Sequence, residues 1–177
     1  MNFKAMNLFL SEENIKKHLD HLRTMKLKHS ILEKSMPEIK GKSISEISRS
    51  TINRKLKNEA LELLWYIKSH ELFFNSFTEN PILTEEIRKQ SFSKEKFFYD
   101  MICEAKEKNY GFLFVYLDKQ GKIKTSFASE FDGAFVKYEP KLCMDLYEHT
   151  YFSDYGFQKE RFLRGAFGYF DMGRLKS

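Results

Sequence analysis

The stretch GFLFVYLDKQGKIKTSF, residues 111–127, decides the fold class of this chain. Its first part is rich in aromatic and branched side chains, as in a buried β-strand, and residues 118–121 have the composition of a turn. A second strand-like run follows over 123–127. The stretch therefore predicts a β-hairpin, placed where a helical sequence ends near Asn109.

The sequence before the hairpin predicts helices. Ser11 is a candidate N-cap, and apolar residues recur at helical spacing after it, so we expect a first helix over 12–35. Residues 36–50 are polar and rich in serine, which favours a connection. A second long helix is expected to begin near Thr51, because apolar residues then step along one face. Together these segments predict an antiparallel helical hairpin.

The remaining segments complete the pattern. A third helix is expected around Met101, with Ser91 or Ser93 as its cap. After the β-hairpin, a short third strand is expected within 135–144, and helical spacing of apolar residues predicts a C-terminal helix within 155–175. Helices followed by a small three-stranded antiparallel sheet and a further helix are typical of an α+β protein.

We expect two domains, divided at the break Asn80-Pro81. The first, over 1–80, is a helical-hairpin domain. The second, over 81–177, is an α+β domain that contains the small sheet.

Composition excludes several classes of protein. With 177 residues, 42% of them hydrophobic, the chain is too large for a disulfide-stapled miniprotein and too apolar for intrinsic disorder. Its longest uncharged apolar stretch, 109–117, is far too short to span a membrane. The two cysteines show neither CxxC spacing nor a repeated framework. We therefore expect a cytoplasmic protein, with the mitochondrion as the alternative compartment.

Histidine is scarce in this chain. The five histidines are His18, His21, His29, His70 and His149. His70 is expected on the buried face of the second helix, where a neutral imidazole needs a polar partner. A backbone carbonyl is the ordinary partner. His18 lies on the apolar side of the first helix, however, and two antiparallel helices can bring both imidazoles together, as in the metal sites of helical bundles.

The segment DLYEHTYF, which begins at Asp145, adds an aspartate and a histidine four positions apart in an aromatic surrounding. Asp145 and His149 are usable as oxygen and nitrogen ligands. With His18 and His70 they form a set that can hold a redox metal with an open position. The alternative is that Asp145 and Glu148 are solvent-exposed charges in a turn.

At these residues the sequence resembles the iron/manganese superoxide dismutase family. The family hallmark Asp-x-Trp-Glu-His-x-Tyr appears from Asp145 to Tyr151, with tyrosine in place of tryptophan. Three further stretches are similar to family segments: SHELFF (69–74) to Asn-His-x-x-Phe-Trp, GKS (41–43) with EI (46–47) to the segment between the helices, and GFLF (111–114) to Gly-Trp-x-Trp. The likeness covers nearly the whole chain.

The resemblance implies that one Fe or Mn ion is bound by four side chains: His18, His70, Asp145 and His149. His29 competes with His18 for the first position, because a different alignment moves the ligand there. As in the family, Glu148 is expected to reach His149 of a second subunit, which implies a homodimer.

Residues expected around the substrate path depart from the family pattern. With His18 as ligand, the positions one and two turns later hold Leu22 and Lys26 instead of a histidine and a gateway tyrosine. Lys26 is a candidate for steering the superoxide anion. The tyrosine that bonds across the family dimer is replaced by Phe152.

The glutamine that hydrogen-bonds the metal-bound solvent in the family has no counterpart either. One of its two sources lies one turn before the second ligand, where Tyr66 stands, and the other is the region of Ser129-Glu130. Tyr66 can donate through its hydroxyl, because it precedes His70 by four residues on the same helix face. A shifted potential and little activity are the expected results of these changes.

Two functions follow from these observations. The first is dismutation of superoxide to dioxygen and hydrogen peroxide, an antioxidant reaction in which the anion enters a basic, aromatic-lined funnel. The second is a catalytically inactive scaffold, such as a basic ribonucleoprotein component of the mitochondrial ribosome, where proteins similar to superoxide dismutases occur. Lysine and arginine exceed acidic residues over 26–57, and the net charge of +5 allows contact with nucleic acid without requiring it.

Overall fold

The computed structural model of the chain describes residues 2–81, 93–131 and 139–175. Its elements are, in chain order, helices α1 (Phe3–Met6) and α2 (Glu12–Ser35), the 3-10 turn η1 (Pro37–Ile39), α3 (Ile44–Arg49), α4 (Arg54–Phe74), α6 (Lys94–Lys106), strands β1 (Phe112–Leu117), β2 (Ile123–Ala128) and β3 (Leu142–Asp145), α8 (Glu148–Tyr155), α9 (Lys159–Gly168) and η2 (Met172–Arg174). The predicted α+β class is confirmed. Among the described helices, none has the length and apolarity needed to cross a bilayer.

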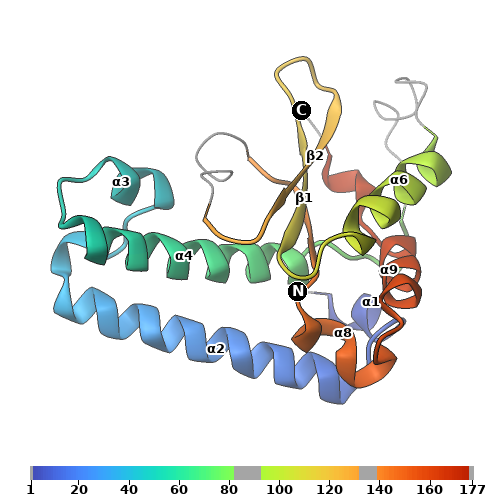
Figure 1. The fold of residues 1–177 in the computed structure, drawn as a ribbon, viewed down its shortest axis with the longest axis horizontal. Helices are drawn as coiled ribbons and strands as arrows, with labels where there is room; N and C mark the ends of the chain where they lie inside the picture. The colour runs from blue at the N-terminus through green and yellow to red at the C-terminus, as the bar shows by residue number, and fades with distance from the viewer. Residues whose placement is uncertain (1, 82–92, 132–138, 176–177) are drawn as a thin grey trace.

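The long helices α2 and α4 form the predicted antiparallel hairpin (Figure 1). The side chain of Ser11 caps α2 by accepting a hydrogen bond from the amide of Asn14 at 3.2 Å. Acidic residues 12–13 occupy the first turn, where they interact favourably with the helix dipole. Helix α4 begins slightly later than the expected Thr51, because Asn53 is the residue that caps it.

The connection between these helices contains a short helix that its serine-rich composition concealed. Helix α3 begins with a capping box, in which the Ser43 oxygen accepts from the amide of Glu46 and the Glu46 carboxylate accepts from the amide of Ser43 at 2.8 Å. Ser-x-x-Glu is the sequence signature of such a start. Ile44 and Ile47 are buried, and α3 contacts α4.

The other two predicted helices are also present. Helix α6 begins after Ser93, whose side chain accepts a hydrogen bond from the amide of Lys96 at 3.2 Å. The other candidate cap, Ser91, lies outside the described residues. The C-terminal helical pattern corresponds to α9, which packs against α6 and buries residues that include Phe162 and Phe167.

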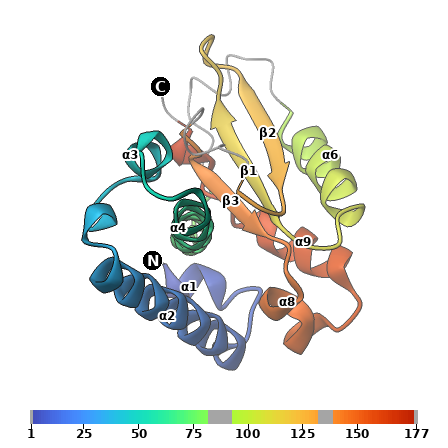
Figure 2. The ribbon, with the colours of Figure 1, turned by 60° about the vertical axis from the view of Figure 1, so that its left-hand side comes forward.

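The sheet has the order β2-β1-β3 with both pairings antiparallel, as predicted. In the pairing of β3 with the central strand, Asp145 lies opposite Phe112. Figure 2 shows α4 between α2 and the sheet, with α6 on the opposite side of the sheet. The third strand occupies the end of the expected segment 135–144, whose residues up to 138 lie outside the described part of the chain.

The segment after α4 joins the two halves of the sequence. The hydroxyl of Ser76 accepts a hydrogen bond from the amide of Cys143 in β3, and the Ser76 carbonyl accepts from the amide of Asp171, both at 2.8 Å. The amide of Thr78 donates to the carbonyl of Tyr169 at 2.8 Å. These bonds fix β3 and the C-terminal residues directly to the end of α4.

Candidate metal centre

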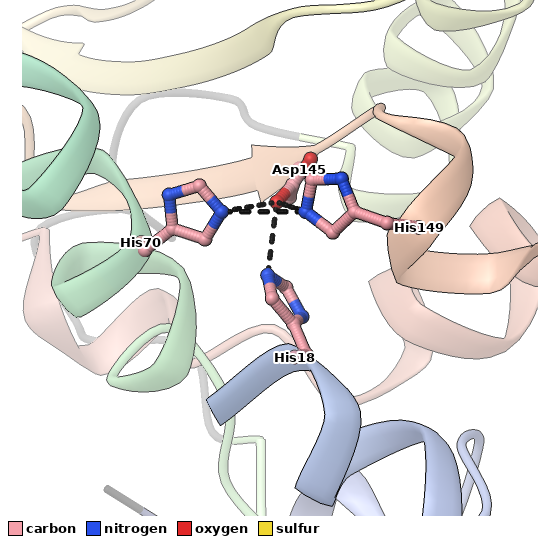
Figure 3. Close-up of side chains that lie close together, drawn as sticks. All are labelled: His18, His70, Asp145 and His149. Atoms are coloured by element: carbon pink, nitrogen blue, oxygen red, sulfur yellow. Dashed lines mark hydrogen bonds and ion pairs between the residues drawn. The ribbon is translucent and has the colours of Figure 1, made fainter. Parts of the chain in front are cut away.

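Four elements bring one polar side chain each to a single point (Figure 3). His18 comes from α2, His70 from α4, Asp145 from the end of β3 and His149 from the first turn of α8. One nitrogen or oxygen atom of each residue lies within 4.8 Å of the others. We call these four residues the His-Asp cluster.

The carboxylate of Asp145 contacts all three imidazoles. Its Oδ2 lies 3.2 Å from Nε2 of His18, 3.3 Å from Nε2 of His70 and 3.5 Å from Nε2 of His149. The Nε2 atoms of His70 and His149 are 3.4 Å apart. Three of the four side chains are fully buried, whereas 31% of the His149 side chain is exposed. His149 is therefore the member of the cluster that borders solvent.

Hydrogen bonds with the backbone orient two of these side chains. Nδ1 of His70 lies 2.8 Å from the carbonyl oxygen of Tyr66. A carbonyl can only accept, so Nδ1 carries the hydrogen and Nε2 keeps its lone pair for the cluster. Oδ1 of Asp145 accepts the amide hydrogen of Tyr147 at 2.9 Å, which leaves Oδ2 for the cluster. His70 therefore has the backbone carbonyl partner that is ordinary for a buried histidine, and it also belongs to the cluster.

The protonation states favour binding of a cation. Burial lowers the pKa of His18, and it lowers the pKa of His70 to about 4. Burial opposes ionisation of Asp145, but the facing imidazoles of His149 and His18 outweigh it and hold the pKa of this carboxyl well below its usual range. At neutral pH these side chains offer nitrogen lone pairs and an anionic oxygen without having to release a proton.

The donor atoms fit a metal ion better than they fit one another. Nε2 of His18 and Oδ2 of Asp145 are buried without a hydrogen-bond partner, which is costly for polar atoms. Donor atoms that share one ion at about 2.1 Å lie roughly 3 to 3.5 Å apart. The distances from Oδ2 of Asp145 to the three imidazole nitrogens, 3.2 to 3.5 Å, match this separation. Imidazole nitrogen with carboxylate oxygen is a common ligand set for first-row transition metals. The His-Asp cluster can therefore hold one metal ion.

Comparison with known proteins decides the family. The family model for the C-terminal domain of iron/manganese superoxide dismutases matches residues 79–174, more than half of the chain. The chain belongs to the iron/manganese superoxide dismutase family. The matched region contains Asp145 and His149, and the other two cluster residues precede it. A comparison with curated proteins found no match.

In this superoxide dismutase homologue, one buried amide fixes α2 against α8. Nδ2 of Asn14, whose residue is 1% exposed, donates to the carbonyl of Thr150 and to the carboxylate of Asp154, both at 3.0 Å. The same carboxylate accepts the amide hydrogen of Ser11 at 2.9 Å. His18 lies one turn after Asn14, and Thr150 directly follows the histidine of α8. These bonds, which we call the Asn14 clamp, set the distance between two cluster residues.

Two tyrosine rings lie against the His-Asp cluster. The ring centroid of Tyr66 is 4.4 Å from that of His70, and Tyr147 stacks on His149 at 5.6 Å. The hydroxyl of Tyr147, at the position of the family tryptophan, donates to the carbonyl of Ser129 at 3.0 Å. Burial raises the pKa of Tyr147 to about 12 and also raises the pKa of Tyr66. Both hydroxyls therefore keep their hydrogen at physiological pH.

Two further residues singled out from the sequence lie beside acidic side chains. Nζ of Lys26 forms an ion pair with Glu71 at 2.7 Å, so its charge is neutralised locally. Nδ1 of His29 lies 3.9 Å from the carboxylate of Glu33. His29 is not among the described residues whose donor atoms converge, whereas His18 is.

His21 lies beside the cluster although the sequence did not single it out. Its ring centroid is 4.8 Å from that of His149 and 5.7 Å from that of His70. Its Nε2 is buried without a hydrogen-bond partner. Leu22, where the family keeps a histidine, is buried in the core instead. The spacing of three residues between His18 and His21 on one helix was the available signal.

A cavity of about 660 Å³ lies beside the two tyrosines, between α2, α4 and the end of β2. Tyr66, Tyr147 and Trp65 contribute the aromatic lining that was expected of a substrate funnel. The charged residues of its lining are three glutamates and one lysine: Glu59, Glu62, Glu130 and Lys28. The prediction of a basic funnel is therefore wrong for this cavity.

Proposed function

We propose that the protein is a superoxide dismutase that binds one Fe or Mn ion through the His-Asp cluster. In this reaction two superoxide anions and two protons give one molecule of dioxygen and one of hydrogen peroxide. The bound ion supplies one-electron chemistry by alternating between two oxidation states. The observation that carries the proposal is the convergence of four donor atoms in a chain of this family.

The protein residues have three roles in this proposal. The backbone bonds to His70 and Asp145 hold the donor atoms toward one point. The buried side chains exclude water from most of the cluster, in which His149 is the one partly exposed member. Tyr66 stands in place of the family glutamine, and its protonated hydroxyl is the proposed hydrogen-bond donor toward solvent at the cluster.

Metal analysis of the purified protein is the direct test. We expect about one Fe or Mn ion per wild-type chain and a large loss of metal in His18→Ala and His70→Ala. His29→Ala is the matched control, because it removes an imidazole from the same helix outside the cluster and should keep its metal. Wild-type protein without Fe or Mn, after growth in supplemented medium and purification without chelators, would remove the basis of the proposal.

A dismutase assay on the same samples separates metal binding from catalysis. Activity in wild type that is lost together with metal in His70→Ala supports the enzyme. A full complement of metal without activity would instead favour the inactive scaffold, in which the replaced outer residues have ended turnover.

We also propose that α8 forms the interface of a homodimer. Glu148 is exposed in the first turn of α8, next to the partly exposed His149. Phe152, one turn further along, is 44% exposed and offers apolar contact area. In the proposed dimer Glu148 of each copy reaches His149 of the other.

A further inference from the structure

The net charge of the chain is concentrated in one short segment. Residues 34–57 contain seven lysines and arginines against two glutamates, which gives the segment a charge of +5, equal to the net charge of the whole chain. The rest of the sequence is therefore neutral overall. We call the seven cations the basic tip: Lys34, Lys40, Lys42, Arg49, Arg54, Lys55 and Lys57.

The basic tip lies at the closed end of the helical hairpin. It covers the end of α2, the connection with η1 and α3, and the first residues of α4, at the left of Figure 1 and away from the sheet. Six of its seven residues are exposed, and Lys57 is half-buried. The His-Asp cluster lies near the start of α2 and the end of α4, so it is at the opposite end of the helical hairpin from the basic tip.

The fold does not neutralise these cations. Eight lysines and arginines elsewhere form ion pairs with acidic residues, but no residue of the basic tip does so within the described part of the chain. Glu46 accepts from the amide and hydroxyl of Ser43, and Lys57 donates to the carbonyl of Ser50. The tip therefore presents uncompensated positive charge to solvent.

Two of the cations are placed unfavourably within their own helix. Arg54 and Lys55 lie in the first turn of α4, which contains no acidic residue. The N-terminus of a helix carries a partial positive charge, so cations there destabilise the free protein. Helix α2, by contrast, begins with Glu12 and Glu13. Arg54 and Lys55 are thus better placed to bind an external anion than to stabilise their own helix.

We propose that the basic tip binds the phosphodiester backbone of double-stranded nucleic acid. Regularly spaced phosphates match a group of unpaired cations, and release of condensed counterions supplies the affinity. A duplex is favoured over a single strand because residues 34–57 include no aromatic side chain on which an unstacked base can lie. A membrane surface is disfavoured because Leu56 is the single exposed large apolar residue in the segment.

Fluorescence anisotropy with labelled 20-base-pair DNA and RNA duplexes of unrelated sequence tests this proposal. The tip variant carries Lys40→Gln, Lys42→Gln and Lys55→Gln. The matched control carries Lys119→Gln, Lys122→Gln and Lys124→Gln, which remove the same charge from exposed positions of the β1–β2 hairpin.

Wild type should bind both duplexes with an affinity that falls steeply with salt. The tip variant should lose more than about tenfold in affinity at 100 mM salt, and its log–log salt slope should be shallower by about 2.7. The control should stay within about twofold of wild type, because its lysines are placed outside the tip.

Several results would overturn the proposal. They are no duplex binding at 50 mM salt, equal losses in both variants, tighter binding to single-stranded oligothymidine than to duplex, or binding to phosphatidylserine vesicles but not to duplex. Circular dichroism and metal content check whether both variants are folded. If the tip variant is not folded, the single variants Lys40→Gln and Lys42→Gln replace it, because both lysines lie in the connection outside any helix. Each should change the log–log salt slope by about 1.

Discussion

The ring and the hydroxyl of Tyr66 act separately at the His-Asp cluster. Its ring packs on His70, and its backbone carbonyl holds Nδ1 of the same histidine. The hydroxyl makes no hydrogen bond with the residues that the structure describes. Replacing tyrosine by phenylalanine therefore keeps both contacts with His70 and removes only the proposed donor.

We expect Tyr66→Phe to retain metal and to change the free energy of unfolding by less than about 0.5 kcal/mol. The dismutation rate per bound metal should fall by about tenfold or more, because the hydrogen-bond donor toward solvent at the cluster is gone. Metal analysis, urea unfolding and a dismutase assay check the three parts. Tyr110→Phe is the control, since Tyr110 is 55% exposed and its ring lies 5.8 Å from Tyr147. A wild-type rate in Tyr66→Phe would contradict the assignment.

The sequence identified every member of the His-Asp cluster but not His21. The cluster residues could be found because a helical stripe and a short local motif mark them. The spacing from His18 places His21 near the same helix face, but its contact with His149 depends on how α8 docks against α2, which joins residues more than a hundred positions apart. The acidic lining of the cavity is unpredictable for the same reason, because it combines residues of α4 with Glu130.

Among the elements, the junction of α2 and α8 decides whether His18 and His149 meet. Its polar contacts are those of the Asn14 clamp, in which a buried amide serves a carbonyl and a carboxylate at once. Removing the Asn14 side chain would leave the buried carbonyl of Thr150 without this hydrogen-bond donor. The junction is therefore the element contact on which both folding and the cluster geometry depend.

The Asn14 clamp gives stability that depends on pH. Burial alone would raise the pKa of Asp154, but hydrogen bonds from Ser11 and Asn14 outweigh it and lower the pKa below its ordinary value of 3.8. The hydrogen bonds to the Asp154 carboxylate therefore stabilise the fold fully above pH 3.8, and this stabilisation is lost as the pH falls through the lowered pKa. We expect Asn14→Ala to reduce the free energy of unfolding at pH 7 by about 1 to 3 kcal/mol and to weaken metal binding.

Urea unfolding at pH 7 and near pH 3 checks the sign of this effect. Asp154→Asn should lose less stability than wild type on acidification, since it has no carboxylate to protonate. Asp20→Asn, at an exposed position of the same α2, is the control and should follow wild type. An acid-induced loss in Asp154→Asn as large as in wild type would contradict the role of the clamp.

Local capping signals explain how well the elements could be predicted. The bounds of α2 followed from Ser11, because a serine before two glutamates marks a helix start in one place. The same kind of signal, Ser43 with Glu46, was present for α3 but was obscured by a serine-rich surrounding. The short α1, Phe3–Met6, has too few residues to show a period.

For the whole molecule, the proposed α8 interface predicts a concentration-dependent dimer. Glu148→Ala should shift wild-type dimers toward monomers at micromolar concentration, because each interface would lose two symmetric contacts. Analytical ultracentrifugation measures the shift. Glu107→Ala removes the same charge from an exposed position after α6 and should leave the dimer intact. A wild-type protein that is monomeric at every concentration would rule out the interface.

The division into domains at residue 80 stays a prediction. The bonds of Ser76 and Thr78 to Cys143, Asp171 and Tyr169 cross the sequence close to this boundary. The four cluster elements, moreover, contact one another in three pairs: α2 with α4, α4 with β3, and α2 with α8. Sequence patterns report each segment alone, whereas these contacts arise only after the segments have come together.

The cluster residues are widely separated along the chain: His70 follows His18 by 52 positions, and Asp145 follows His70 by 75. One ion bound by all of them closes two long loops, as a crosslink does, and such loops are entropically unfavourable to close otherwise. Binding stabilises only chains that have already brought these residues together. The metal available during synthesis would therefore determine how much protein survives degradation, and a cell short of metal would hold fewer copies of it.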